Sequence, residues 1–426
     1  MQNFFKKISL IISDKALRNR ILFVTGALVI FRFLSTIPVP GIDPVKLQSF
    51  FDSPTGDIFG LFNIFSGGGL SNMSIVMLGV GPYITASIVM QLLTMIFPKL
   101  KEMYQQEGEA GRAKFTQYSR LLTVPLALIQ GGGFLLLLQK SGVVSQLSSL
   151  EMITNIVVIV AGSMFLMWLG ELMTEFGIGN GTSLIIFAGI VAAVPGNLIQ
   201  MLASFNPAQI PMYLAFVVVA LLVVLGVVIV TEAERPIPIT YAKRIRGNKV
   251  YGGVSTYLPL RVNQAGVIPI IFALSILLFP QMIFQFLSTG VSNEVVKSIA
   301  TFILDILKNG WFYSIFYFIL VFLFTYFYTA VTFDPHAISE NLQKNGAFIP
   351  GVRPGQSTSE YIGKVLTRIT LVGATFLGLI AVLPLIMRAV TGIQSLAIGG
   401  TALLIVVSVV IDLMKKVDAQ VSMREY

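Results

Sequence analysis

The hydrophobic positions of this chain gather into ten long apolar stretches separated by polar loops. A helix needs about 20 apolar residues to cross a bilayer, because only a helix satisfies its own backbone polar groups within one segment of lipid-exposed chain. Most of the stretches approach that length, so the pattern predicts an all-α polytopic membrane protein. The expected spans are residues 21–39, 73–97, 121–138, 152–173, 182–201, 212–231, 263–286, 311–333, 369–387 and 398–414.

The distribution of Lys and Arg predicts the orientation of these spans. Of the 29 Lys and Arg residues, 23 lie in the terminal segments and the loops on their side, five lie on the other side, and Arg32 lies within a span. Positively charged loops remain cytoplasmic, so we expect both termini in the cytoplasm. This bias accounts for the net charge of +9 without nucleic acid, and a composition of 55% hydrophobic and 12% charged residues excludes a water-soluble surface.

Ten spans divide into five and five near residue 207. With an odd number of spans in each half, the second half enters from the opposite side, which is the topology of an inverted repeat with its path near the midplane. We therefore expect an N-terminal half at 1–207 and a C-terminal half at 208–426. The apolar segment 57–70 is half a membrane thick and contains three consecutive glycines near its end. It predicts either a re-entrant half-helix or a cap packed on the bundle.

The chain offers little chemistry for an enzyme. It has no Cys and one His, His336, and it contains no Gly-rich phosphate loop, zinc motif or nucleophile elbow. The clearest ionisable residues within spans are Arg32, Glu171 and Asp412, whereas ion-coupled transporters place such costly groups along their ion path. We expect no catalytic residue, metal or cofactor, and a secondary transporter of a small solute is the less favoured alternative.

One face of the second span carries a stripe that is aliphatic near the middle of the membrane and polar toward the cytoplasm. Its members recur at helical spacing and are Val80, Ile84, Ser87, Gln91 and Thr94. Such a stripe lines either a path through the protein or a helix–helix contact, where Ser, Thr and Gln hydrogen-bond across. The spacing alone favours neither interpretation.

Longer motifs are distributed along nearly the whole chain. They are IPVPG (37–41), LGVGPYI (78–84), QLLT (91–94), EGEAGR (107–112), MFLMWLGE (164–171), GIGNG (177–181), YGGVSTYLPLRVNQAGVIP (251–269), GAFIPGVRPG (346–355) and GGTALLIV (399–406). In these motifs and their order the chain resembles the SecY family, the channel subunits of bacterial protein translocases. The resemblance implies a clamshell of ten transmembrane helices in two inverted five-helix halves, which conducts unfolded polypeptide passively.

The resemblance also implies the site residues of the channel. Its pore narrows to an aliphatic ring at Val80, Ile84, Ile186, Ile271 and Ile405, while a sixth ring position falls on the polar Thr182. Apolar side chains dewet a narrow opening, yet they form no bonds with a passing chain. Segment 57–70 becomes a plug, with the apolar residues Ile58, Phe59, Leu61, Phe62, Ile64 and Phe65 and a hinge at Gly67, Gly68 and Gly69.

A lateral gate and docking loops are implied in the same way. The gate would release signal sequences and transmembrane segments into lipid between the second and seventh spans, at Ser87, Gln91 and Asn263. A SecA-type motor ATPase and the ribosome would dock on the cytoplasmic loops 232–262 and 334–365, at Arg235, Lys243, Arg244, Arg246, Lys249 and Arg353. The family's basic pair at the tip of the first loop reads Asn248–Lys249 here. Further implied partners are SecE-type and SecG-type small subunits and a preprotein with a signal sequence, in the bacterial cytoplasmic membrane.

Overall fold

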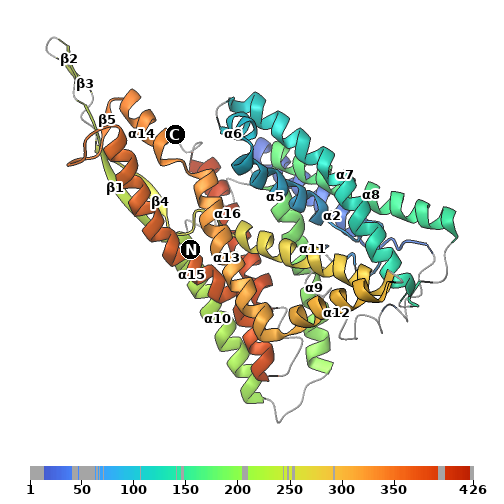
Figure 1. Ribbon diagram of the computed structural model, residues 1–426. Coiled ribbons are helices and arrows are strands. Elements are labelled where there is room, and N and C mark those ends of the chain that lie inside the picture. The colour runs from blue at the N-terminus through green and yellow to red at the C-terminus, as the bar shows by residue number, and fades with distance from the viewer. Residues whose placement is uncertain are drawn as a thin grey trace.

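Helices dominate the architecture (Figure 1). The computed structural model describes residues 14–40, 47, 63, 66, 68–70, 72–105, 107–140, 142–144, 148–203, 210–242, 244–246, 249–251, 255–290, 293–391 and 399–422. Each expected span overlaps a helix. These helices are α2 (Lys15–Leu34), α5 (Gly81–Ile96), α7 (Gly108–Lys140), α8 (Ser149–Phe176), α9 (Gly181–Ala203), α10 (Ile210–Glu232), α11 (Ile268–Gly290), α13 (Gly310–Thr332), α15 (Gln356–Thr391) and α16 (Gly399–Ser422).

Several helix bounds differ from the predicted spans for local reasons. The second span was predicted from residue 73, but residues 75–80 form turns, with Gly79 at φ 57°, and α5 begins only at Gly81. Helices α7 and α15 extend well before their apolar segments, because polar side chains are compatible with a helix that continues into water. Three shorter helices were not predicted: α6 (Pro98–Gln105), α12 (Glu294–Lys308) and α14 (Pro335–Lys344).

Length and hydropathy alone identify fewer spans than the whole pattern does. Within the described residues, four helical segments are long and apolar enough to cross a membrane: Gly108–Gln139, Ser149–Phe176, Gly310–Lys344 and Gln356–Met387. A fifth qualifies if α5 and α6, bent by 117° at their junction, are taken as one span. Shorter apolar helical stretches occur at Gly181–Gly196, Val217–Glu232 and Ile268–Leu277.

The helices form two groups joined by α9 and α11 (Figure 1). Helices α10, α13, α15 and α16 pack on one another, and α2, α5, α7 and α8 form the other group. Helix α9 contacts α2, α8 and α16, while α11 contacts α5, α7, α13 and α15. One apolar cluster accordingly draws residues from both groups, and a second cluster lies within the N-terminal half, between α7, α8 and the turns before α5.

The two basic loops fold into a small antiparallel sheet, which was not predicted. Strand β1 (Glu234–Tyr241) pairs on one edge with β4 (Ser255–Arg261) and on the other with β5 (Ala347–Phe348). The alternating Ile237 and Ile239 are buried, and Ile237 packs in a cluster with Leu260 and Ile362 of α15. The hairpin of β2 (Arg244–Arg246) and β3 (Lys249–Tyr251) projects beyond this sheet (Figure 1).

Candidate conducting path

Five aliphatic side chains predicted to form a ring lie in the same apolar cluster. Val80, Ile186, Ile271 and Ile405 belong to its buried core, and Ile84 packs against it. They come from the start of α5 and from α9, α11 and α16, so both halves of the chain contribute. All five residues therefore belong to one apolar cluster, to which four segments far apart in the sequence contribute.

Val80 and Pro82 specify where α5 begins. Val80 occupies the N-cap position, where its carbonyl accepts a bond from the Ile84 amide at 3.0 Å. Pro82 lies in the first turn, where a missing amide donor costs nothing. The predicted stripe continues along the helix to Thr94, whose hydroxyl donates to the Gln91 carbonyl at 2.6 Å. This bond satisfies the threonine hydroxyl within its own helix.

Thr182, the sixth predicted ring position, contacts α8. It is half-buried in the first turn of α9, close to α8. A methyl group built on Gly170 of α8 would lie 3.3 Å from the Thr182 hydroxyl oxygen. Thr182 thus packs against α8.

Two of the predicted gate residues have buried amide oxygens that accept no hydrogen bond among the described residues. Helices α5 and α11 contact each other, and Asn263, just before α11, is 6% exposed. Among the described residues, the side-chain oxygens of Asn263 and Gln91 accept no hydrogen bond, and the Ser408 hydroxyl of α16 has no partner. A buried polar group left unpaired costs about 1–3 kcal/mol. The structure therefore shows no hydrogen bond accepted by either amide across the predicted gate.

A pocket of about 270 Å³ lies between the residues just before α11, the start of α9 and the second half of α16. Asn263 and Ser408 line it, and their unpaired oxygen atoms are buried behind its surface. Two ion pairs lie at its edge: Lys416 with Asp412 at 2.8 Å, and Lys415 with Glu232 of α10 at 2.9 Å. The Lys415–Glu232 pair connects the second half of α16 to the end of α10.

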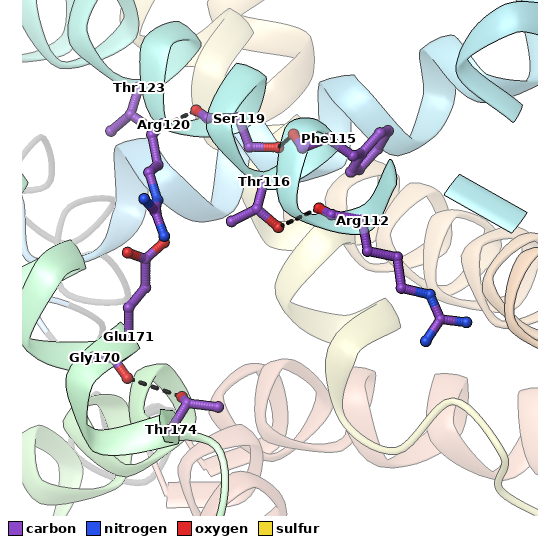
Figure 2. Close-up of polar contacts among 9 residues, drawn as sticks. All are labelled: Arg112, Phe115, Thr116, Ser119, Arg120, Thr123, Gly170, Glu171 and Thr174. Atoms are coloured by element: carbon purple, nitrogen blue, oxygen red, sulfur yellow. Dashed lines mark hydrogen bonds and ion pairs between the residues drawn. The ribbon is translucent and has the colours of Figure 1, made fainter. Parts of the chain in front are cut away.

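An ion pair that sequence reasoning missed joins α7 to α8. Figure 2 shows the Arg120 side chain reaching the Glu171 carboxylate, while Arg112, about two turns earlier on α7, points away. The Arg120 Nε–Glu171 Oε1 distance is 2.8 Å, and the two side chains are 48% and 19% exposed. Tyr83 of α5 also interacts with Glu171 and with Ser87. The available signal was that Arg120 and Glu171 carry opposite charges and lie at the ends of consecutive spans on the same side of the membrane.

The predicted plug lies largely outside the described residues. This applies to Ile58, Phe59, Leu61, Phe62, Ile64, Phe65 and Gly67. Of the hinge, Gly68 adopts φ 80°, a conformation that favours glycine. Gly69 is restricted by space instead, because a Cβ there would lie 2.8 Å from the Ser74 hydroxyl oxygen.

The predicted docking residues lie on or beside the sheet. Arg235 is exposed on β1, and Arg353 is exposed in the turn after β5, where its carbonyl accepts a bond from Thr358. Arg246 pairs with Lys249 in the register of the β2–β3 hairpin, which also contains Arg244. Lys243 lies outside the described residues.

Comparison with known proteins agrees with this architecture. The SecY family matches residues 74–414. The protein translocase subunit SecY of Mycobacterium leprae is 42% identical over 430 residues, which cover 96% of each chain. A solved protein-conducting channel has a TM-score of 0.66 and 21% identity over 93% of this chain and 91% of that chain. Sec61 in a canine ribosome–channel complex from the endoplasmic reticulum has a TM-score of 0.62 and 20% identity, with coverage of 93% and 91%.

The fold and the two-sided apolar cluster define a multi-pass helical membrane protein with the architecture of a protein-conducting channel. The predicted ten-helix clamshell agrees with this result. The chain belongs to the SecY family. It is a channel subunit of a protein translocase and not an enzyme.

Proposed function

We propose that this chain forms a passive path for unfolded secretory polypeptide across the bacterial cytoplasmic membrane. The narrow point of the path is the aliphatic ring of Val80, Ile84, Ile186, Ile271 and Ile405. The observation that supports it best is that these five side chains, from the start of α5 and from α9, α11 and α16, all belong to the one apolar cluster that both halves build. Apolar side chains exclude ions from a narrow opening and hold no passing sequence by hydrogen bonds. The sixth position of this ring falls on the polar Thr182.

The same proposal includes a lateral exit between α5 and α11 and a seal by segment 57–70. Ser87, Gln91 and Asn263 would border the exit, where apolar segments gain free energy by entering lipid and charged ones lose it. The contact between α5 and α11 and the unpaired amides support this location. The two groups of helices would move apart as an N-terminal half (1–207) and a C-terminal half (208–426).

The driving force would come from partners on the cytoplasmic side. A motor ATPase of the SecA type and the translating ribosome would dock on the sheet and on the β2–β3 hairpin. The exposure of Arg235 and Arg353 and the basic hairpin support this proposal, because rRNA phosphates attract Arg and Lys. Small SecE-type and SecG-type subunits would complete the assembly. The excess of Lys and Arg on this side supports a cytoplasmic position for both termini.

Site-specific photo-crosslinking tests the path. A photoreactive amino acid replaces Ile186, Ile271 or Ile405 in turn, and a secretory precursor is arrested in the reconstituted translocase by a folded C-terminal domain. Ile159 is the matched control, since it is equally buried but belongs to the second apolar cluster. We expect crosslinks to the precursor from the three ring positions and none from Ile159.

Two outcomes of the crosslinking experiment would contradict the proposal. Equal labelling from Ile159 would mean that the precursor does not follow the predicted path. Labelling of lipid alone from the ring positions would place these side chains on the outside of the bundle. A requirement for both ATP and the motor in forming the crosslinks distinguishes arrested translocation from passive binding.

A further inference from the structure

Helix α12 is an amphipathic helix whose sequence determines both of its ends. The Asn293 side chain caps its first turn by accepting a bond from the Val295 amide at 3.0 Å, and Glu294 complements the positive end of the helix. Asn309 ends α12 and caps α13, where its side chain accepts from the Trp311 amide at 3.1 Å. Both ends are thus specified locally, so α12 is a defined element of the fold and not an irregular connection.

The helix presents three separate faces. Its inner face is buried against the protein, with Ala300 1% and Leu304 5% exposed, and α12 contacts both α11 and α13. A second face is also apolar but open: Val295, Ile299 and Phe302 are 66%, 54% and 66% exposed. The third face is exposed and polar and consists of Glu294, Lys297, Ser298, Thr301 and Asp305. Packing on α11 and α13 therefore accounts for only part of the apolar surface of α12.

The open apolar face has a chemically similar neighbour on α13. That helix starts directly after α12 and exposes a stripe of large apolar side chains along its length: Trp311, Phe312, Ile315, Phe316, Ile319 and Leu323. In a membrane-spanning helix such a stripe faces lipid. Trp311, at the very start of α13, is a residue type enriched at the boundary between lipid and water.

The position of α12 follows from the topology. Helix α11 begins soon after strand β4, and α13 ends next to α14, which leads to β5. Because both helices cross the membrane, α12 joins their other ends and lies on the side opposite the sheet. Figure 1 shows α12 running back alongside α11 before the chain turns into α13.

We propose that α12 is an interfacial helix embedded in the lipid leaflet opposite the sheet. Its open apolar face lies among acyl chains, and its polar face meets the headgroups and water. A helix with one apolar and one charged face binds the boundary region of a bilayer in this way. The inner face of α12 packs on α11, which borders the proposed lateral exit. The contact of α12 with lipid therefore also holds α11 in place.

Spin labelling in lipid vesicles tests the proposal, and the absence of cysteine from the natural chain makes each label unique. Three single-cysteine variants probe the open apolar face: Val295→Cys, Ile299→Cys and Phe302→Cys. Matched variants probe the polar face of the same helix: Ser298→Cys, Thr301→Cys and Asp305→Cys. The labelled proteins are reconstituted in vesicles of phosphatidylcholine and phosphatidylglycerol. Collision with oxygen, which concentrates in lipid, is compared with collision with a water-soluble nickel chelate.

We expect the ratio of oxygen to nickel collisions to be several-fold higher at the apolar positions than at the polar ones. The pair Thr301 and Phe302 gives the sharpest contrast, because the two residues are consecutive in the helix and lie on different faces. Equal nickel access on both faces would place α12 in water and overturn the proposal. Protection of the apolar positions from both reagents would mean that protein covers this face, which would overturn it as well.

Discussion

Replacing Asn263 by Leu should make the channel harder to open. In this structure the Asn263 side chain is 6% exposed, and its oxygen accepts no hydrogen bond among the described residues. On the proposed function this arrangement is the closed state, and it carries the cost of the unpaired amide oxygen. Opening toward the pocket that Asn263 lines would let water or the backbone of a passing chain satisfy that group. A leucine side chain at this position would remove the cost from the closed state only.

The size of the effect follows from the unpaired oxygen. Leaving a buried polar group unpaired costs about 1–3 kcal/mol, so the substitution stabilises the closed state by about that amount. A leucine in a spanning segment contributes roughly 0.3–0.6 kcal/mol toward insertion. Roughly two to six additional leucines in the signal sequence would then restore opening, at ~0.5 kcal/mol each.

A graded series of signal sequences measures this threshold. Each signal differs by one leucine, and translocation of a common reporter is followed in cells that depend on the variant. Gln130→Leu is the matched control, because Gln130 is 5% exposed, its oxygen is also unpaired, and it lies on α7 between Ala127 and Phe134 of the second cluster. Replacing Gln130 by Leu relieves the same cost at a site away from the proposed exit. The signal hydrophobicity needed for translocation should therefore not change.

The opposite result has a clear meaning. If Asn263 held α5 and α11 together by a hydrogen bond, Asn263→Leu would loosen the gate and less hydrophobic signals would suffice. A lower threshold, or an unchanged one, would refute the reasoning from the unpaired amide. A shift of the same size in Gln130→Leu would show that the effect is one of general stability.

Two further predictions concern packing within the N-terminal half. Arg120→Gln should lower the free energy of unfolding by about 0.5–1 kcal/mol, a modest loss because the Arg120 side chain is 48% exposed and water screens the pair. Thermal unfolding in detergent measures it, and the exchange Arg120→Glu with Glu171→Arg should recover most of the loss; no recovery would show that the pair itself contributes nothing. Gly162→Ala should cost about 1–3 kcal/mol, because its Cβ would overlap the carbonyl oxygen of Ile75. Gly133→Ala, with nothing within 4 Å of the new methyl group, should not be destabilising, and equal losses in the two variants would contradict the steric argument.

The positions of the spanning helices were predictable because the bilayer imposes one length and one chemistry on each of them. The turn that displaces the start of α5 was harder to predict, since residues 73–80 are as apolar as the helix that follows. Helix α12 was also missed, because its alternation of apolar and polar residues over four turns resembles neither a span nor an ordinary loop.

The sequence by itself determined the class of the protein and the number of spans, and its resemblance to a family supplied the residues proposed for the pore. These properties depend on hydropathy along one segment at a time and on motifs that are continuous in the chain. Only the tertiary structure decided that Val80, Ile186, Ile271 and Ile405 share one cluster and that Arg120 reaches Glu171. It also decided that, among the described residues, the amide oxygens of Gln91 and Asn263 accept no hydrogen bond. The physical reason is that each of these facts depends on how separate helices pack, and lipid, which is as apolar as most of the side chains, leaves that packing to a few close contacts between helices.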